Sequence, residues 1–353
     1  KVLFLIQHAN IKSKEALVKQ FDHEVKASTV VKPFIQKKLT GPSDGAVLWT
    51  GLYGGSKDGA ICISSGMAPQ VSHLDTYAMT QFSIDEAVRN AVSCGANPSF
   101  ISVCDNYCWP DPIKSLNTPD GEHKLAQLVR STKALYDTAM VYGTPFISGK
   151  DSMKNDFIGE TKTGDKLKIS VPPTLLITAV AKLDHIDHFM TTDFKQEKDL
   201  VYYLGPIDFE QTYYSTLHPD LQQLPEIKLK ENKLRYELLH KLISNKMINS
   251  SHDISEGGII TSVIESLFPQ KLGFNFESSA LAPNESIEAF LFNEIPGGFI
   301  LSVSPEARNK FETLTQNQAR FLGVINTSET ITYDNQLNLN INELHKLWSR
   351  DEY

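Results

Sequence analysis

The apolar segments of this 353-residue chain fall into two groups, and a polar stretch at residues 191–198 separates them. In both groups, short runs rich in apolar and β-branched residues, typical of buried strands, alternate with longer stretches of helical spacing. A chain of this length usually forms two domains. No strand–helix run opens with the glycine-rich turn of a Rossmann fold, so the sequence predicts two α+β domains.

The polar segments also predict where these domains begin and end. Residues 39–190 and 191–335 are expected to form an N-terminal and a C-terminal domain. Glycine and proline cluster at residues 37–45, which is typical of a linker. We therefore expect residues 1–38 to be the tail of a preceding domain and its linker, and residues 336–353 to be a C-terminal extension.

Periodicity places individual elements within this plan. The first domain is expected to hold strands at residues 46–49, 59–64, 100–104 and 174–181, and helices at 83–95 and 124–142. The second is expected to hold strands at 200–204, 247–253, 299–303 and 321–325, and helices at 231–245, 259–267 and 305–317. Before them, residues 2–6 predict a buried strand, 13–21 a polar helix and 27–35 a strand. One side of helix 124–142 is expected to carry Leu125, Leu128, Leu135, Ala139 and Met140.

Composition excludes several classes of protein. The chain has 34 Lys and Arg against 42 Asp and Glu, a formal net charge of −8, which argues against broad nucleic-acid binding. The apolar run at residues 2–6 is far shorter than the roughly 20 residues of a membrane span, so no membrane attachment is expected. The cysteines lack the paired spacing of a zinc site and indicate free thiols in a cytoplasmic protein.

The segment Gly149-Lys150-Asp151-Ser152 follows an apolar stretch at residues 144–148 and has the composition of a phosphate-binding loop. Its spacing is not that of a Walker A loop, because the preceding glycine, Gly143, is one position too early and Asp151 follows the lysine. Backbone N–H groups and Lys150 could still bind a phosphate. The alternative is an ordinary solvated turn.

Glu86 and Asn90 are four residues apart, so their side chains would project from one face of a helix. Two oxygen ligands at this spacing suit a hard cation such as Mg²⁺. The alternative is that Ser83 and Glu86 form a capping box at the start of helix 83–95, with Asn90 on the surface.

Two polar turns follow predicted strands. In His252-Asp253-Ile254-Ser255-Glu256-Gly257-Gly258, the glycine pair permits close backbone approach and three side chains offer oxygen ligands. In the turn at residues 105–111, Asp105 follows a strand, and the alternative there is an Asx-turn with an aromatic cover. Serine-hydrolase chemistry finds no support because no G-x-S-x-G elbow occurs, and His185-x-x-His188 lacks zincin spacing.

Five segments together carry a family resemblance. They are Asp58-Gly59-Ala60, Ser83-Ile84-Asp85-Glu86-Ala87-Val88-Arg89-Asn90, Asp105-Asn106, Ser148-Gly149-Lys150-Asp151-Ser152-Met153 and His252-Asp253-Ile254-Ser255-Glu256-Gly257-Gly258. In this order and at these distances, the chain resembles the second half of the synthetase portion of phosphoribosylformylglycinamidine synthases over roughly residues 22–330.

The resemblance implies a fold and an activity. The fold is that of aminoimidazole ribonucleotide synthetase-like ATP-binding proteins, in which an α+β N-terminal domain contributes to a barrel shared with a second half. The activity is that of an ATP-dependent C–N ligase of purine biosynthesis. That enzyme converts ATP, formylglycinamide ribonucleotide and glutamine into formylglycinamidine ribonucleotide, ADP, phosphate and glutamate, with Mg²⁺ neutralising the transferring phosphates.

The resemblance also implies residue roles. Mg²⁺ ligands at a site for ATP or ADP are matched by Asp58, Glu86, Asn90 and Asp253, and a nucleotide contact is matched by Ser255. Positions that contact ATP or substrate are matched by Asp105, Gly149 and Ser152. Lys150 stands where shorter members have a metal-binding Asn, so a phosphate contact is expected there. No catalytic residue is expected in this half.

Two parts of the complete enzyme have no counterpart in the sequence: the glutaminase domain and the first synthetase half with its catalytic His. The expected partners are therefore the other synthetase half and a glutaminase domain or subunit, and the chain alone is not expected to make the amidine. The start at Lys1 fits a piece of a longer polypeptide. The alternatives are a stand-alone homodimeric ATP-dependent kinase or synthetase of the same fold, and a non-catalytic structural module.

Overall fold

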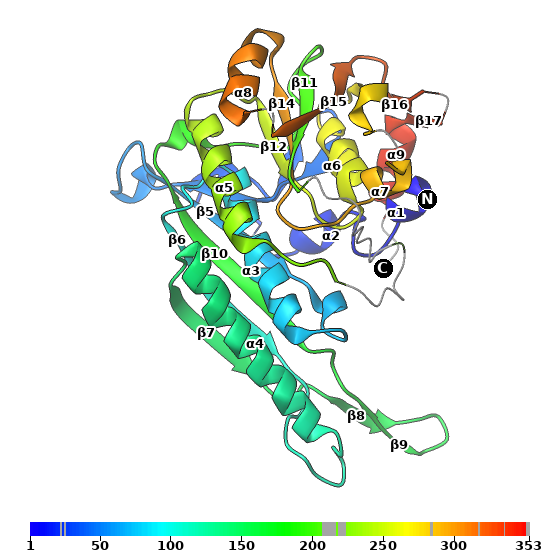
Figure 1. The fold of residues 1–353 in the computed structure, drawn as a ribbon. Coiled ribbons are helices and arrows are strands. Elements are labelled where there is room, and N and C mark those ends of the chain that lie inside the picture. Colours follow the sequence, from blue (N-terminus) through cyan, green and yellow to red (C-terminus); the bar gives the residue numbers. More distant parts are fainter. Residues whose placement is uncertain are drawn as a thin grey trace.

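Two large β-sheets organise the chain, one in each half of the sequence (Figure 1). The structure is a computed structural model that describes residues 1–350 apart from 22, 25, 207–216, 218–223, 283–284, 317, 335 and the side chain of Tyr53. Helices pack on both sheets. The predicted α+β class is therefore confirmed.

The first sheet has the strand order β1 (Thr29–Val31), β4 (Gly45–Trp49), β5 (Ala60–Met67), β10 (Thr174–Leu183), β6 (Ile101–Cys108) and β7 (Phe146–Ser152). Burial alternates along β5 and β10, so one face is packed and the other is open. Helix α3 (Thr76–Ser93) packs on β5 and β10, and α4 (Gly121–Tyr142) lies against α3. All strands and both helices predicted for this half are present.

Strand direction gives this sheet one polar end. Strands β5 and β6 both pair antiparallel with β10, and β7 is parallel to β6, so β5, β6 and β7 run in the same direction. Their carboxyl ends therefore lie at one end of the sheet. Strand β4 is antiparallel to β5, which brings the start of β4 to this same end.

Helix α3 begins seven residues earlier than the capping-box interpretation predicts. Its N-cap is Asp75, whose side chain accepts a hydrogen bond from the Tyr77 N–H. Ser83 lies inside the helix, where its hydroxyl donates to the Met79 carbonyl. The capping box of Ser83 and Glu86 is therefore wrong, and Glu86 is free of that role. The predicted end near Gly95 is confirmed, with Gly95 at a φ of +101°.

The second sheet has the strand order β12 (Ser250–Asp253), β14 (Phe299–Val303), β11 (Leu200–Leu204), β15 (Ala319–Asn326), β13 (Gly273–Phe276), β16 (Thr330–Tyr333) and β17 (Leu337–Asn340). Its helices are α5 (Leu229–Ser244), α6 (Gly258–Leu267), α7 (Ile287–Leu291), α8 (Arg308–Thr315) and α9 (Ile341–Trp348). Helices cover both faces: Phe299 and Leu301 of β14 share a core cluster with α5, and Ile300 shares one with α6. The predicted strands and helices of this half are confirmed.

The prediction fails at the amino terminus. Residues 2–6 form no strand but the helix α1 (Val2–Leu5), because Leu5 and Ile6 are buried on one side while Leu3 and Phe4 remain exposed. The predicted helix at 13–21 is the single turn α2 (Glu15–Val18). Pro33 divides the expected strand at 27–35 into β1 and β2 (Phe34–Gln36), and β2 pairs with β3 (Thr40–Pro42).

The segment expected to be a C-terminal extension contributes to the second half. Strand β17 pairs with β16, and α9 buries Ile341, Leu344 and Trp348. Trp348 also holds the amino terminus, since its indole N–H donates to the Ile11 carbonyl at 3.0 Å.

Apolar side chains remain exposed on the first half. On α4, Leu125 and Met140 are exposed whereas Leu135 is buried, so the predicted apolar side is only partly covered. The hairpin of β8 (Phe157–Glu160) and β9 (Lys166–Ile169) projects from this half (Figure 1) and exposes Phe157 and Ile158. No helix in the described ranges is long and apolar enough to cross a bilayer.

Gly66 permits the close packing of β5 on α3. A Cβ atom at this position would lie 2.2 Å from the Ser83 carbonyl oxygen and 2.5 Å from the Ala87 nitrogen, both backbone atoms. We expect Gly66→Ala to lower the free energy of unfolding by about 2–3 kcal/mol in urea titrations, because the helix must move away. Its exposed neighbour is the control, and Ser65→Ala should change stability by less than about 0.5 kcal/mol. Equal stabilities of the two variants would contradict this packing.

Candidate functional site

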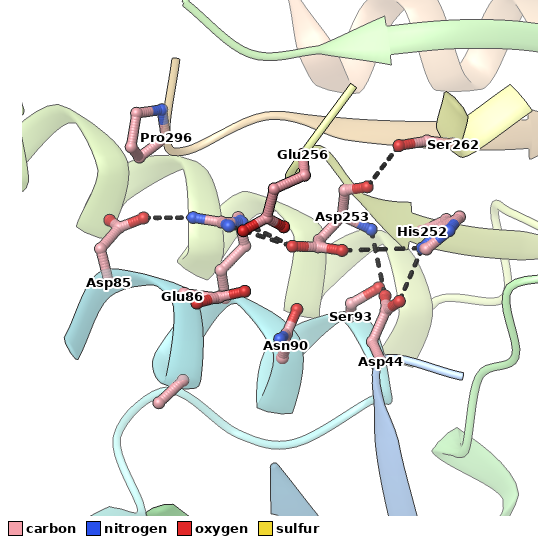
Figure 2. A network of polar contacts seen from close by, with 12 residues as sticks. Asp44, Asp85, Glu86, Asn90, Ser93, His252, Asp253, Glu256, Ser262 and Pro296 are labelled. Atoms are coloured by element: carbon pink, nitrogen blue, oxygen red, sulfur yellow. Dashed lines mark hydrogen bonds and ion pairs between the residues drawn. The ribbon is translucent and has the colours of Figure 1, made fainter. Parts of the chain in front are cut away.

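Helix α3 joins the two halves of the chain, and the polar residues on its far side form the candidate site (Figure 2). While α3 packs on the first sheet, it also contacts β12 and α5 of the second half. Ser93 at its end and Ser251 of β12 are linked by a hydroxyl hydrogen bond of 3.0 Å. Polar residues of α3 thus face the turn that follows β12.

Arg89 lies at the centre of this contact with 3% of its side chain exposed. Its Nε and one terminal nitrogen both donate to Oδ2 of Asp253, at 3.1 and 3.0 Å. Its other terminal nitrogen pairs with Oδ2 of Asp85. Buried charges are tolerated only when paired, so this network fixes α3 against β12.

Asp85 extends the network into two further helices. Its Oδ1 accepts hydrogen bonds from Tyr142 of α4 and from Asn232 and Tyr236 of α5, the last two at 2.9 and 2.7 Å. Burial and the Asp85 carboxylate raise the pKa of Tyr142 and Tyr236 well above the ordinary value, which keeps both hydroxyls as donors.

Asp44, which directly precedes β4, contacts the end of β12 beside this network. Its Oδ1 lies 2.6 Å from Nδ1 of His252, and its Oδ2 accepts the Asp253 N–H at 3.0 Å. Burial alone would lower the pKa of His252, but Asp44 and Glu265 raise it well above the usual value. Burial and the nearby Asp44 raise the pKa of Asp253 to about 6. In the described part of the chain, Asp44, His252 and Asp253 are also the one group of three such side chains close enough to share a metal ion.

Glu86 and Asn90 face this acidic group from α3, one helical turn apart. Glu86 accepts the Met67 N–H at 2.8 Å, and Asn90 donates to the Ser65 carbonyl at 3.1 Å. Burial, Glu256 and Asp253 raise the pKa of Glu86 well above its usual value, against the opposing charge of Arg89. The Oδ1 atom of Asn90 is buried without a hydrogen-bond partner. An orphaned acceptor beside crowded carboxylates suits a cation.

A narrow cleft of about 40 Å³ opens beside these residues. Its lining comes from both halves of the chain and consists of Met67, Ala68, Gln70, Phe82, Glu86, Arg89, Ile254, Ser255, Glu256, Glu294 and Pro296. One water needs roughly 10–15 Å³ by this measure, so the cleft has room for a cation with a few ligand atoms.

The remaining predicted residues form a second polar group at the same end of the first sheet. The segment Gly149–Ser152 lies within β7 rather than in a turn after a strand, which corrects that prediction. Asp105 of β6 pairs with Gly149, and a Cβ on Gly149 would lie 2.4 Å from the Asp105 carboxylate, so glycine leaves room for it. Lys150 donates to the Ser152 hydroxyl. Burial raises the pKa of Asp105.

Asp58 is not brought to either group. It precedes β5, is largely exposed and lies 3.6 Å from Nε2 of His185. Glu86 binds Met67 at the opposite end of β5, about 23 Å from the first residue of that strand at the usual rise per residue. Asp44 was not predicted from the sequence, although Asp44-Gly45-Ala46 repeats the Asp-Gly-Ala pattern of residues 58–60.

Glu256 provides a pH-dependent test of the cleft. Burial, Glu294 and Asp253 raise its pKa to about 7. The folded chain therefore retains on Glu256 a proton that the unfolded chain releases near pH 4.5. The contribution of this proton to the free energy of unfolding is fully present below pH 4.5 and is lost as the pH rises through 7. Glu256→Gln cannot ionise, so we expect it to raise the free energy of unfolding in EDTA by about 1–2 kcal/mol at pH 8, with little change at pH 4.5. The exposed control Glu237→Gln should show no such pH dependence; an equal effect of Glu256→Gln at both pH values would refute the raised pKa.

Comparison with known proteins finds several that this chain is similar to. Residues 199–334 match the family described as "AIR synthase related protein, C-terminal domain". The chain is 27% identical over 356 residues to "Phosphoribosylformylglycinamidine synthase subunit PurL" of Leuconostoc mesenteroides, covering 98% of this chain and 43% of the relative. It is 30% identical over 339 residues to the protein of the same name from Carboxydothermus hydrogenoformans, covering 93% and 42%. The chain thus spans less than half the length of these relatives.

Solved structures share the fold. "T. maritima PurL complexed with FGAR" superposes with a TM-score of 0.67 at 12% identity, covering 100% of this chain and 54% of that one. "T. maritima PurL complexed with ADP" gives 0.62 at 13% identity, covering 84% and 46%. Family match, curated relatives and fold agree, and the chain is a PurL- and AIR-synthase-like protein.

Proposed function

We propose that this chain is the ATP- and Mg²⁺-binding half of a phosphoribosylformylglycinamidine synthase of purine biosynthesis. The observation that carries the proposal is the buried Oδ1 atom of Asn90, which has no hydrogen-bond partner and lies on the helix face that Glu86 and Asp253 also border. The printed name of the curated relatives supports this choice of reaction. That reaction is ATP-dependent transfer of nitrogen from glutamine to formylglycinamide ribonucleotide.

The oxygen atoms of this cluster fit Mg²⁺. We assign Glu86, Asn90 and Asp253 as its ligands, with Asp44 in the place that the family resemblance gave to Asp58. Carboxylate and amide oxygens are the protein ligands that Mg²⁺ prefers, and phosphates usually complete its shell. When bound, Mg²⁺ would neutralise the phosphates of the nucleotide. Because the cleft is small, the base and ribose lie outside it, and Ser255 on the cleft wall contacts the phosphates.

In the proposal, the second polar group contacts the part of the ATP or substrate that lies away from the Mg²⁺ site. Asp105, Gly149, Lys150 and Ser152 lie on β6 and β7, whose carboxyl ends share one end of the sheet with that of β5. Lys150 and Ser152 belong to an edge strand that is almost entirely exposed, so their donors are accessible to a phosphate. This half holds no catalytic residue of its own in the proposal.

The open face of the first sheet is the proposed contact with the other synthetase half. Ile63 of β5 is 39% exposed and Met67 is 44% exposed on this face, and Ile147 of the edge strand β7 is 60% exposed. Apolar side chains gathered on one sheet face usually mark an interface. A glutaminase domain or subunit would then supply ammonia, and the chain alone makes no amidine.

Nucleotide binding tests the central assignment. The purified chain is expected to release close to one equivalent of ADP or ATP on heat denaturation, or to bind Mg-ATP in calorimetry after the nucleotide has been removed. Glu86→Ala should weaken Mg-ATP binding at least about tenfold, because one ligand is lost. The exposed Glu237→Ala on α5 is the control and should bind as the wild type does. If the wild type neither retains nor binds nucleotide, the proposed function is wrong.

The interface predicts self-association when the other half is missing. Two copies can cover each other's open face, so sedimentation velocity is expected to show a dimer. Ile63→Asp should raise its dissociation constant at least about tenfold, because a charge would be buried. Leu234→Asp introduces the same charge at an exposed leucine of α5 and should leave association unchanged. A monomeric wild type, or equal effects of both variants, would count against this face.

A further inference from the structure

The guanidinium of Arg89 faces carboxylates on several sides. Asp85 and Asp253 pair with it directly, and the negative charge of Glu86 also acts on it. Glu256, across the cleft, is influenced by Arg89 in turn. Without Arg89, the buried carboxylate of Asp85 would lose its ion-pair partner and that of Asp253 its closest one, which is strongly destabilising.

The contacts of Arg89 leave part of the site free. Both nitrogen atoms that reach Asp253 bind its Oδ2, so Oδ1 makes no contact with Arg89. The Oδ1 atom of Asn90, the next residue of α3, is buried without a partner, and Asn90 is only 9% exposed. In Figure 2 this side chain points between Glu86 and the Asp44–Asp253 pair. Arg89 thus binds Oδ2 of Asp253, and Oδ1, which lies 3.7 Å from Nδ1 of His252, is the oxygen that remains for a ligand.

We propose that Arg89 is the built-in counter-ion and positioning residue of the cation site. It orients Asp253 through Oδ2 and contributes one positive charge, so the cleft stays assembled when no metal is bound. This inference rests on the proposed Mg²⁺ site. It assigns a role to Arg89, which lies on the same turn of α3 as the proposed ligands Glu86 and Asn90. Arg89 lowers the affinity for a divalent cation and makes folding independent of it.

Opposite effects on affinity and stability follow from this double role. The positive charge of Arg89 repels an incoming divalent cation across a few ångströms of partly desolvated protein. Removing that charge should tighten cation binding and at the same time destabilise the metal-free fold. A residue with a purely structural role would lower stability without tightening binding. The two roles are therefore separable by experiment.

The test uses the full 353-residue chain and Arg89→Met, which keeps much of the side-chain length but not the charge. Mn²⁺, a paramagnetic substitute for Mg²⁺, is titrated and followed by electron paramagnetic resonance. We expect Arg89→Met to bind Mn²⁺ about tenfold more tightly than the wild type. Its melting temperature in EDTA should be lower, and Mg²⁺ should raise it by at least about twice the wild-type shift, since a tighter ligand stabilises more.

Two further variants separate charge from geometry. Arg89→Lys keeps the charge but cannot bridge Asp85 and Asp253 with a planar fork, so it should melt earlier with near-wild-type Mn²⁺ affinity. Arg320→Met removes an ion pair with Glu285 away from the cleft. It is the matched control, and its loss of stability should be equal with and without Mg²⁺.

Each outcome decides between the hypotheses. Unchanged or weaker Mn²⁺ binding by Arg89→Met, in a wild type that does bind Mn²⁺, overturns the role of Arg89 alone. A variant that fails to fold even with Mg²⁺ also overturns it, because the cation then cannot replace the arginine. If the wild type itself binds no Mn²⁺ and no nucleotide, the proposed function fails as well.

Discussion

The buried ion pairs of Arg89 are the interaction on which the rest of this structure depends. They connect the helix that covers the first sheet to the edge strand of the second, and Asp85 extends the connection to α4 and α5. Because these charges are desolvated, a small displacement of either half would leave a carboxylate unpaired. The same contacts that hold the halves in register thus set the positions of Glu86, Asn90 and Asp253 beside the cleft.

Much of the fold could be predicted from the sequence because its signals are local. Strands β11 and β14 of the second half are buried on both faces and appear as largely apolar runs. The failures occur where burial is one-sided and the element is short. Residues 2–6 resemble a strand, yet only Leu5 and Ile6 are covered, and that pattern also fits one helical turn. The start of α3 was misplaced because Ser83-x-x-Glu86 matches the sequence of a capping box, although both residues lie inside the helix.

The candidate site was predictable where spacing alone determines geometry. A separation of four residues places Glu86 and Asn90 on one helix face, and the turn after β12 had to present Asp253 at a strand end. Arg89 was not predicted, because its i,i+4 spacing from Asp85 is common on exposed helix faces, and its burial depends on Asp253, which is distant in the sequence. Asp58 and Asp44 carry the same local pattern, and only strand direction distinguishes them. Asp44 precedes β4, whose start adjoins the carboxyl end of β5, whereas Asp58 precedes β5 itself.

Strand direction also explains why two polar groups lie close enough to serve one ligand. In the sheet, Met67 is paired with Leu176, Leu176 with Asn106 and Asn106 with Lys150. Three strand spacings separate the Met67 backbone, which binds Glu86, from Lys150, a span of about 14 Å. Reversing any one of β5, β6 or β7 would move its polar residues to the far end of the sheet. The topology, more than any single motif, brings the acidic cleft and the Lys150 strand to one place.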